Sequence, residues 1–143
     1  MSDMSGKAAD AASRLGLAAG DIVGELGYDD DVDMDLRAGI EAVIGSEILD
    51  GDADEVFDAV LVWWRAGDGD LADELVDAMT LLADDGIIIL ITPRAGLDGF
   101  VGAGDIDEAA DTAGLGQATS GIPFGSWRTV KLTRARSSGK SRR

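Results

Sequence analysis

The sequence contains no cysteine and no histidine among its 143 residues. Their absence excludes thiol chemistry, disulfides, imidazole general bases and most zinc sites. Neither a phosphate-binding P-loop nor a Gly-x-Ser-x-Gly nucleophile elbow occurs. No apolar run reaches the roughly 18 residues that span a bilayer, and no signal-peptide apolar segment is evident. We therefore expect a cytoplasmic protein that makes no membrane contact.

The charge is strongly acidic and unevenly distributed, with a formal net charge of −16. All 28 acidic residues precede residue 112, whereas 7 of the 12 basic residues follow it. An acidic body repels nucleic acid at long range. The polar, basic segment 134–143 is expected to be a disordered tail. It either solubilises the chain or contacts nucleic acid or an acidic partner.

The apolar pattern alternates between strand and helix periodicity. It predicts flexible residues 1–14, followed by a single α/β domain over 15–133. This alternation favours a three-layer, Rossmann-like arrangement with a mainly parallel sheet and right-handed crossovers. The expected strands are 22–27, 46–49, 56–64, 87–91 and 129–133, and the expected helices are 33–44, 70–84 and 105–113.

Polar residues and glycines mark the expected helix ends. Asp33 or Asp35 precedes the first helix and Gly45 follows it. Gly39 inside that helix costs roughly 1 kcal/mol relative to alanine, so the helix depends on packing. The second helix is expected to start at a capping pair, Asp70 and Asp73, and to stop at Gly86. Asp105 and Glu108 predict the start of the third, and Gly114 predicts its end.

The first expected strand leads into a turn that is unusual for a nucleotide-binding domain. Gly27 is present, but Tyr28 and Asp29 follow where a cofactor-binding turn needs exposed backbone N–H groups. Three consecutive aspartates, Asp29–Asp31, would also repel an anion. The turn therefore indicates a cofactor site that was lost or never existed.

Several polar and aromatic residues lie at expected strand ends, where open α/β sheets bind ligands. Trp63 and Trp64 should face opposite sides of their strand, followed by Arg65. In one interpretation a tryptophan lines a pocket and Arg65 binds an anion; in the other the indoles cover helices and Arg65 pairs with a nearby aspartate. The candidate ligand-binding set is Glu25, Gly27, Tyr28, Asp29, Trp64, Arg65, Thr92 and Arg94. Nothing distinguishes any one acid as catalytic.

Two further features are weaker candidates. Asp50-x-Asp52-x-Asp54 has the first spacings of a calcium loop, but Glu55 and Leu61 replace the required glycine and glutamate. We therefore predict solvated turns and no metal site, with weak Mg²⁺ or Ca²⁺ association through the clustered carboxylates as the alternative. The segment 120–127 contains two exposed-looking aromatics, which either cap the sheet or contact a partner.

Phe57–Trp64, the following helix and Leu82-Ala-Asp-Asp-Gly86-Ile-Ile-Ile-Leu-Ile91 resemble the second half of a class I methyltransferase domain. In that resemblance, Glu25 corresponds to the acid of the first strand, and Glu47 or Asp50 to the acid of the second. Such enzymes bind S-adenosyl-methionine, but the glycine-rich turn that holds it is missing here. The resemblance implies a truncated methyltransferase-type fold.

A closer resemblance spans roughly residues 15–115. It is carried by Glu25-Leu-Gly-Tyr-Asp-Asp-Asp-Val-Asp33, Leu49-Asp-Gly-Asp-Ala-Asp-Glu-Val56, Trp63-Trp-Arg-Ala-Gly-Asp-Gly-Asp-Leu71, Thr92-Pro-Arg94 and Thr112-Ala-Gly-Leu115. These motifs are similar to those of the actinobacterial domain-of-unknown-function family 3052. That resemblance implies a fold and a compartment but no catalytic residue.

Three functional hypotheses follow. The first is a non-catalytic interaction or regulatory module with an unknown protein partner. The second is a small-ligand or S-adenosyl-methionine binder, with or without methyl transfer. The third, nucleic-acid contact through the basic tail, predicts binding that falls steeply with salt.

Overall fold

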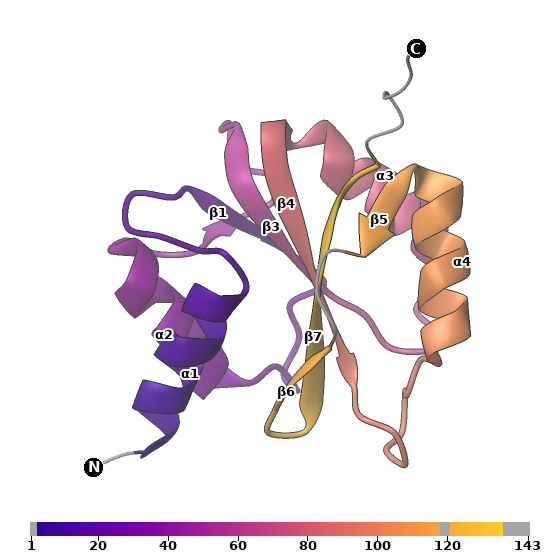
Figure 1. Cartoon of the computed structure of the whole chain (residues 1–143), viewed down its shortest axis with the longest axis horizontal. Helices are drawn as coiled ribbons and strands as arrows, with labels where there is room; N and C mark the ends of the chain where they lie inside the picture. Colours follow the sequence, from indigo (N-terminus) through magenta and orange to yellow (C-terminus); the bar gives the residue numbers. More distant parts are fainter. Residues whose placement is uncertain (1–2, 118–120, 136–143) are drawn as a thin grey trace.

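The computed structural model describes residues 3–117 and 121–135, with side chains from residue 6 onward. Its strands form one mixed sheet in the order β2-β1-β3-β4-β7-β5, with β6 paired to β7 (Figure 1). None of the helices in this part of the chain is long and apolar enough to cross a membrane. The elements in chain order are α1 (Asp3–Arg14), β1 (Val23–Leu26), α2 (Met34–Ile44), β2 (Leu49–Asp50), β3 (Phe57–Trp63), α3 (Leu71–Thr80), β4 (Leu82–Pro93), α4 (Ala103–Ala113), β5 (Leu115–Gln117), β6 (Ile122–Phe124) and β7 (Trp127–Arg134).

The sheet combines a parallel half with an antiparallel half. Strands β2, β1, β3 and β4 are parallel neighbours, as the strand–helix alternation predicts. Strand β7 instead pairs antiparallel with β4, and β5 and β6 pair antiparallel with β7. Strands β6 and β7 are antiparallel because a connection as short as theirs can join only antiparallel strands.

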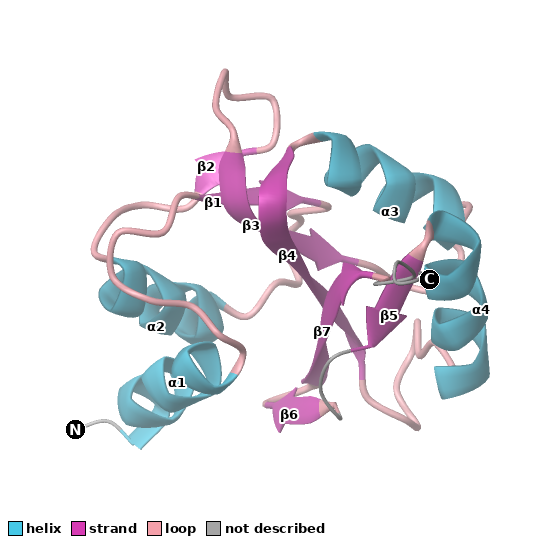
Figure 2. Cartoon of the chain, turned by 45° about the horizontal axis from the view of Figure 1, so that its top comes forward, coloured by secondary structure: helices cyan, strands magenta, loops and turns pink. Residues whose placement is uncertain are grey.

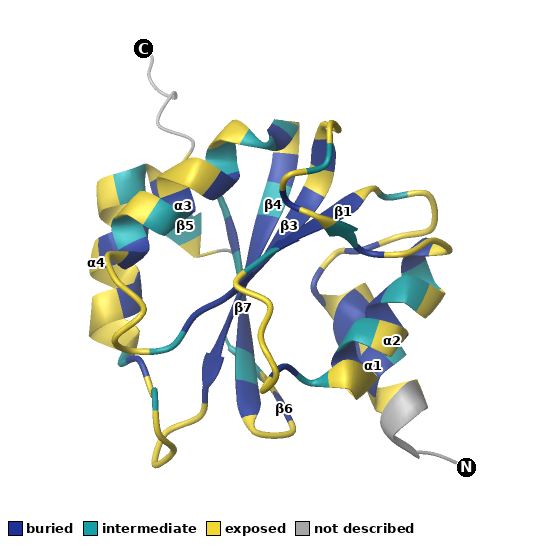
Figure 3. Cartoon of the chain, turned by 180° about the vertical axis from the view of Figure 1, so that it is seen from behind, coloured by how far each residue is buried: buried dark blue, intermediate teal, exposed yellow. Residues whose placement is uncertain are grey.

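Apolar side chains fill both faces of the sheet. Strands β3 and β4 are buried along most of their length, which explains their nearly continuous apolar runs (Figure 3). Trp63 belongs to the core beneath α1 and α2, whereas Trp64 belongs to the core beneath α3 and α4. Figure 2 shows these two helix pairs on opposite sides of the sheet. The predicted alternation of the two tryptophans is confirmed.

The N-terminal segment differs from the expectation of flexibility. Residues 3–14 form α1, and Ala8, Ala11 and Ala12 are buried against the rest of the core. Helix α2 permits this packing because Gly39 faces α1: a Cβ on Gly39 would lie 2.2 Å from the Cβ of Ala8. The small residues of segment 1–14 therefore form a close helix–helix contact.

The helix predicted over 70–84 is shorter than expected. Asp70 caps α3 by accepting a hydrogen bond from the backbone N–H of Asp73, as predicted, but the helix ends at Thr80. Leu82 already pairs with Phe57, so Gly86 lies inside β4 and does not stop a helix. The residues after Thr80 join the sheet because pairing with β3 outweighs their tendency to form a helix.

The other helix ends match the sequence more closely. Asp33 caps α2 through a bond from the N–H of Leu36, and Gly45 ends it with a φ of 84°. Gly114 ends α4 as expected, also with a φ of 84°. The start of α4 differs, because Gly102 is its N-cap and Asp105 lies within the first turn, making no cap hydrogen bond.

The C-terminal strands also extend beyond the prediction. Phe124 and Trp127, the two aromatics of segment 120–127, are each 5% exposed, which agrees with the alternative in which they cap the sheet. Arg134, placed in the predicted tail, is the last residue of β7 and donates hydrogen bonds to the carbonyls of Met79, Ala83 and Asp84. The predicted disorder of 136–143 lies outside the described residues.

Candidate functional site

The end of β1 adopts the backbone conformation that a tight strand–helix turn requires. Gly27 has a φ of 80°, and a Cβ there would lie 2.2 Å from the carbonyl oxygen of Trp63. Only glycine combines this φ with such a close approach between two strand ends. The structure of this turn therefore requires glycine at position 27.

Glu25 forms a buried ion pair beside this turn. Its carboxylate accepts two hydrogen bonds from Arg37 of α2, at 2.8 and 2.9 Å. One of the same oxygens also accepts a hydrogen bond from the indole Nε1 of Trp63 at 2.8 Å. The Glu25 side chain is 7% exposed, and its hydrogen bond holds the pKa of Arg37 above its ordinary value, against the effect of burial. Glu25 is therefore bound to groups within the protein on the face covered by α1 and α2.

Arg65 lies between the ends of β1 and β3. One guanidinium nitrogen donates to the carbonyls of Gly27 and Trp63, at 2.8 and 3.2 Å. The other nitrogens form a two-point contact with the carboxylate of Asp31, and Asp68 lies within ion-pair distance. The guanidinium also lies over the ring of Trp127, 5.4 Å from its centroid. We call this set of contacts the Arg65 bridge.

Electrostatics reinforce the Arg65 bridge. The hydrogen bond from Arg65 lowers the pKa of Asp31, with burial opposing that shift and the guanidinium charge adding to it. Burial is the largest single effect on Arg65 and lowers its pKa, but the hydrogen bonds and charges of Asp31 and Asp68 together outweigh burial, so the pKa of Arg65 is raised. Both groups are charged at neutral pH, so the bridge stays closed over the physiological range.

The eight candidate residues do not form a single pocket. Glu25, Gly27 and Arg65 meet around Trp63, and Tyr28 lies beneath Arg37 with its ring centroid 5.0 Å from the guanidinium carbon. Asp29 accepts a hydrogen bond from the N–H of Asp30 in the exposed turn. Trp64 belongs to the opposite core, and Thr92 alternates onto that side with Leu90. Arg94 donates to the carbonyl of Gly125, away from Glu25 and Arg37.

Sequence reasoning missed three residues that complete this region. Arg37 and Asp31 supply the partners of Glu25 and Arg65, and Trp127 packs edge-on against Trp63 with ring centroids 5.0 Å apart. One signal was available for Arg37: it is one of only five basic residues before position 112. The sequence marked Trp127 only as an aromatic of segment 120–127, because its approach to Trp63 depends on the antiparallel placement of β7.

The described residues contain no group of three or more acidic side chains placed to bind a metal ion. The carboxylate nearest to the first strand end, Glu25, is already paired. The arrangement can therefore stabilise the ends of β1 and β3.

The α/β fold is similar to the folds of several solved methyltransferases. The chain is similar to a methyltransferase from Pyrococcus furiosus (14% identity, TM-score 0.52, covering 87% of this chain and 79% of that one). It is also similar to a SAM-dependent O-methyltransferase from Thermotoga maritima (10%, TM-score 0.57, 90% and 64%) and to a ribosomal protein L11 methylase from Lactobacillus delbrueckii subsp. bulgaricus (17%, TM-score 0.54, 93% and 80%). At these identities the similarity concerns the fold.

The chain belongs to the family described as Protein of unknown function (DUF3052), whose model matches residues 12–136. The uncharacterized protein Rv2239c of Mycobacterium tuberculosis is 48% identical over 126 residues, covering 88% of this chain and 79% of that protein. The uncharacterized protein Mb2263c of Mycobacterium bovis matches to the same extent. The resemblance inferred from the sequence motifs is therefore confirmed.

Proposed function

We propose that this protein is a cytoplasmic, non-catalytic interaction or regulatory module built on a truncated, three-layer methyltransferase-type fold. The observation that carries the proposal is the Arg65 bridge. Its guanidinium lies within hydrogen-bond distance of the carbonyls that end β1 and β3. These strand ends are where open α/β sheets bind their ligands.

Two further observations support a site closed to an adenosyl cofactor. The carboxylate of Glu25 is already bound by Arg37 and Trp63. Asp29 and Asp31 replace the small residues that let a cofactor approach the backbone after Gly27. A ligand entering here would have to break the ion pair between Arg65 and Asp31.

A second candidate function, binding of S-adenosyl-methionine, is favoured by one observation. Glu25-Leu26-Gly27 retains the acid and the first glycine of the methyltransferase turn, and Gly27 keeps the required positive φ. In this alternative Arg65 swings away from Asp31 when the cofactor binds. Methyl transfer would then need a substrate site as well, so cofactor binding is the step to test first.

Titration calorimetry and thermal unfolding with S-adenosyl-methionine separate these two functions. A ligand at about 100 times its dissociation constant adds roughly 2.7 kcal/mol of stability, which raises Tm by several degrees. We expect no binding heat and no change in Tm for the wild-type protein. A saturable binding heat for the wild-type protein, accompanied by a rise in Tm, would refute a site closed to the cofactor.

The matched variants are Arg65→Ala, which opens the bridge, and Lys131→Ala, which removes the same charge from a β7 residue outside the bridge. If the bridge alone excludes the cofactor, Arg65→Ala gains binding and Lys131→Ala does not. If neither variant binds, the acidic turn also contributes to closure. Nucleic-acid contact through the basic tail is the weakest alternative and predicts an affinity that falls steeply with salt.

A further inference from the structure

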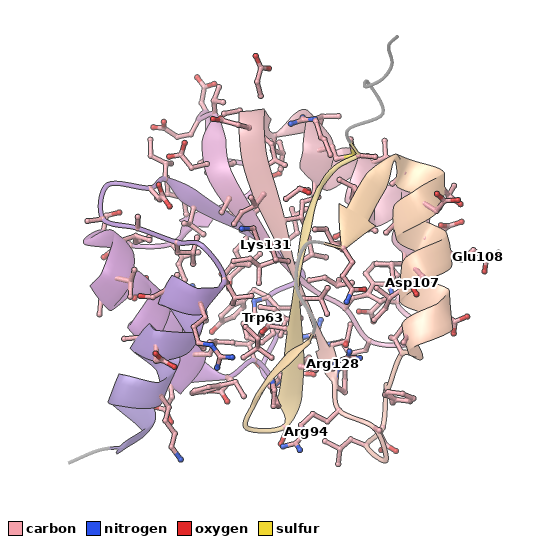
Figure 4. All side chains as sticks on the ribbon, in the orientation of Figure 1. Trp63, Arg94, Asp107, Glu108, Arg128 and Lys131 are labelled. Atoms are coloured by element: carbon pink, nitrogen blue, oxygen red, sulfur yellow. The ribbon has the colours of Figure 1, made fainter. Side chains whose placement is uncertain are left out.

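Four basic side chains surround the β6–β7 hairpin. Lys7 and Arg14 come from α1, Arg94 follows β4, and Arg128 lies on β7. Within the described residues the ion pairs engage Arg37 and Arg65 and none of these four. Figure 4 shows Arg94 and Arg128 near the end of the sheet where β6 and β7 meet. Unpaired cations gathered in one place are unexpected in a chain of net charge −16.

Two cavities adjoin at this position, and Arg94 and Pro123 line both. The first, of about 400 Å3, is bounded by Lys7, Arg14 and Arg94 together with β6. The second, of about 360 Å3, is bounded by Arg94, Arg128 and the half-exposed ring of Phe100. Each volume lies in the range of small-molecule sites. We call the two cavities together the basic groove.

The lining of the basic groove combines charge with apolar surface. Asp10 is the one acidic side chain that lines either cavity, against four cations. Arginine presents a planar fork that matches phosphate oxygens in two-point contacts, and a phosphate carries about −1.5 to −2 charges. Four cations are more than a ligand with a single carboxylate would require, so they favour a ligand with the higher charge of a phosphate. Phe100 and Pro123 offer an apolar wall for an uncharged, flat group.

We propose that the basic groove binds a nucleoside phosphate. The phosphate lies between Arg14 and Arg94 in the first cavity, and the base packs against Phe100 and Pro123 in the second. This site goes beyond the proposed function and does not depend on it, because none of its lining residues belongs to the Arg65 bridge. The acidic body repels anions at long range, so the groove acts through contact and not through long-range steering.

Titration of the full-length protein with ADP, followed by two-dimensional amide NMR, tests the proposal. We expect saturable shifts at residues lining the groove, such as Ala11, Ala95 and Gly125. Pyrophosphate and adenosine, titrated separately, should each bind more weakly than ADP, since each fills only one cavity. Shifts confined to residues 136–143, or absent from the groove, would overturn the proposal.

Charge variants supply the second readout. Arg14→Gln should weaken ADP binding about tenfold, the value of one lost charge-assisted contact. Arg14 makes no ion pair with a described residue, so Tm should not change. Lys131→Gln removes the same charge from a β7 residue that lines neither cavity and should bind ADP as the wild type does. Equal weakening in both variants would show a nonspecific charge effect and refute the site.

Discussion

Replacing Gly39 by alanine tests whether α1 packs on α2, because the substitution should lower the stability of the protein if the helices are in contact and raise it if they are not. In an exposed helix this substitution stabilises by about 1 kcal/mol, because alanine is the better helix former. Here the added Cβ would lie 2.2 Å from the Cβ of Ala8, 2.6 Å from its carbonyl carbon and 2.8 Å from the backbone nitrogen of Ala9. Real Cβ atoms do not approach other atoms so closely, so the helices must move apart.

Overpacking a core costs typically 1–3 kcal/mol, and contacts with backbone atoms place Gly39→Ala toward the upper end. Subtracting the gain in helix propensity leaves a net destabilisation of roughly 1–2 kcal/mol. For a domain of this size, we expect Tm to fall by roughly 3–8 °C. Urea unfolding should show the same loss in the midpoint with an unchanged slope.

Gly6→Ala is the matched control, since a Cβ there has no atom within 4 Å. It lies in α1 itself, so it should stabilise by up to about 1 kcal/mol if α1 is docked in the folded state. Combining Gly39→Ala with Ala8→Gly should recover part of the loss. Recovery is incomplete because two of the close contacts involve the backbone of Ala8 and Ala9.

The opposite pattern would refute the packing argument. If segment 1–14 were flexible, Gly39→Ala would raise Tm, and Gly6→Ala would leave it unchanged. A destabilised Gly39→Ala variant that Ala8→Gly does not improve would place the conflict elsewhere on α2.

Three further predictions concern polar contacts. Glu25→Leu should lower the free energy of unfolding, measured in urea, by about 3 kcal/mol, because it leaves Arg37 and the Trp63 indole without their acceptor. Glu25→Gln keeps an acceptor and should therefore cost less. An equal loss in both variants would contradict this account. Burial raises the pKa of Glu74, and Asp77 and Asp68 add to the shift. When the pKa of a carboxyl is higher in the folded than in the unfolded state, its contribution to stability is fully present below the unfolded-state pKa. That contribution is lost as the pH rises through the folded-state pKa. Glu74→Gln should therefore raise Tm at pH 7 and leave it unchanged below about pH 4, and a benefit at both pH values would contradict the titration argument. Arg134→Ala should lower stability by about 1.5–3 kcal/mol through its lost carbonyl contacts, and an unchanged urea midpoint would show that these contacts are not stabilising.

The parallel half of the sheet was predictable because its signals are local. The apolar runs of β3 and β4, the Asp33 and Asp70 caps and the Gly45 stop each lie within a few residues of the element that they define. Helix α1 was not predicted because its alanines carry little apolar surface. Their burial depends on Gly39, which is distant in sequence. A glycine inside a helix is unfavourable, and this was the one sign in the sequence that another element packs closely at that position.

The candidate site was predictable only in outline. The sequence placed Glu25, Gly27 and Arg65 at neighbouring strand ends, and these residues do meet around Trp63. It grouped Trp64 and Thr92 with Glu25 and Arg65 by their strand-end positions, although the predicted alternation already placed Trp64 on the other face from Trp63. It also did not identify Asp31 as the partner of Arg65 among several aspartates of one turn. Choosing between them requires the three-dimensional course of the turn.

The short edge strands of the sheet restrict how another polypeptide can bind. Strand β2 contains two residues and β5 contains three, so neither offers a run of free backbone groups long enough to template an added strand. Within the described structure, neither of these two edge strands is long enough for a partner that binds by adding a strand to the sheet. Short outer strands and a high net charge also oppose self-association through sheet stacking, so we expect the protein to stay dispersed in concentrated solution.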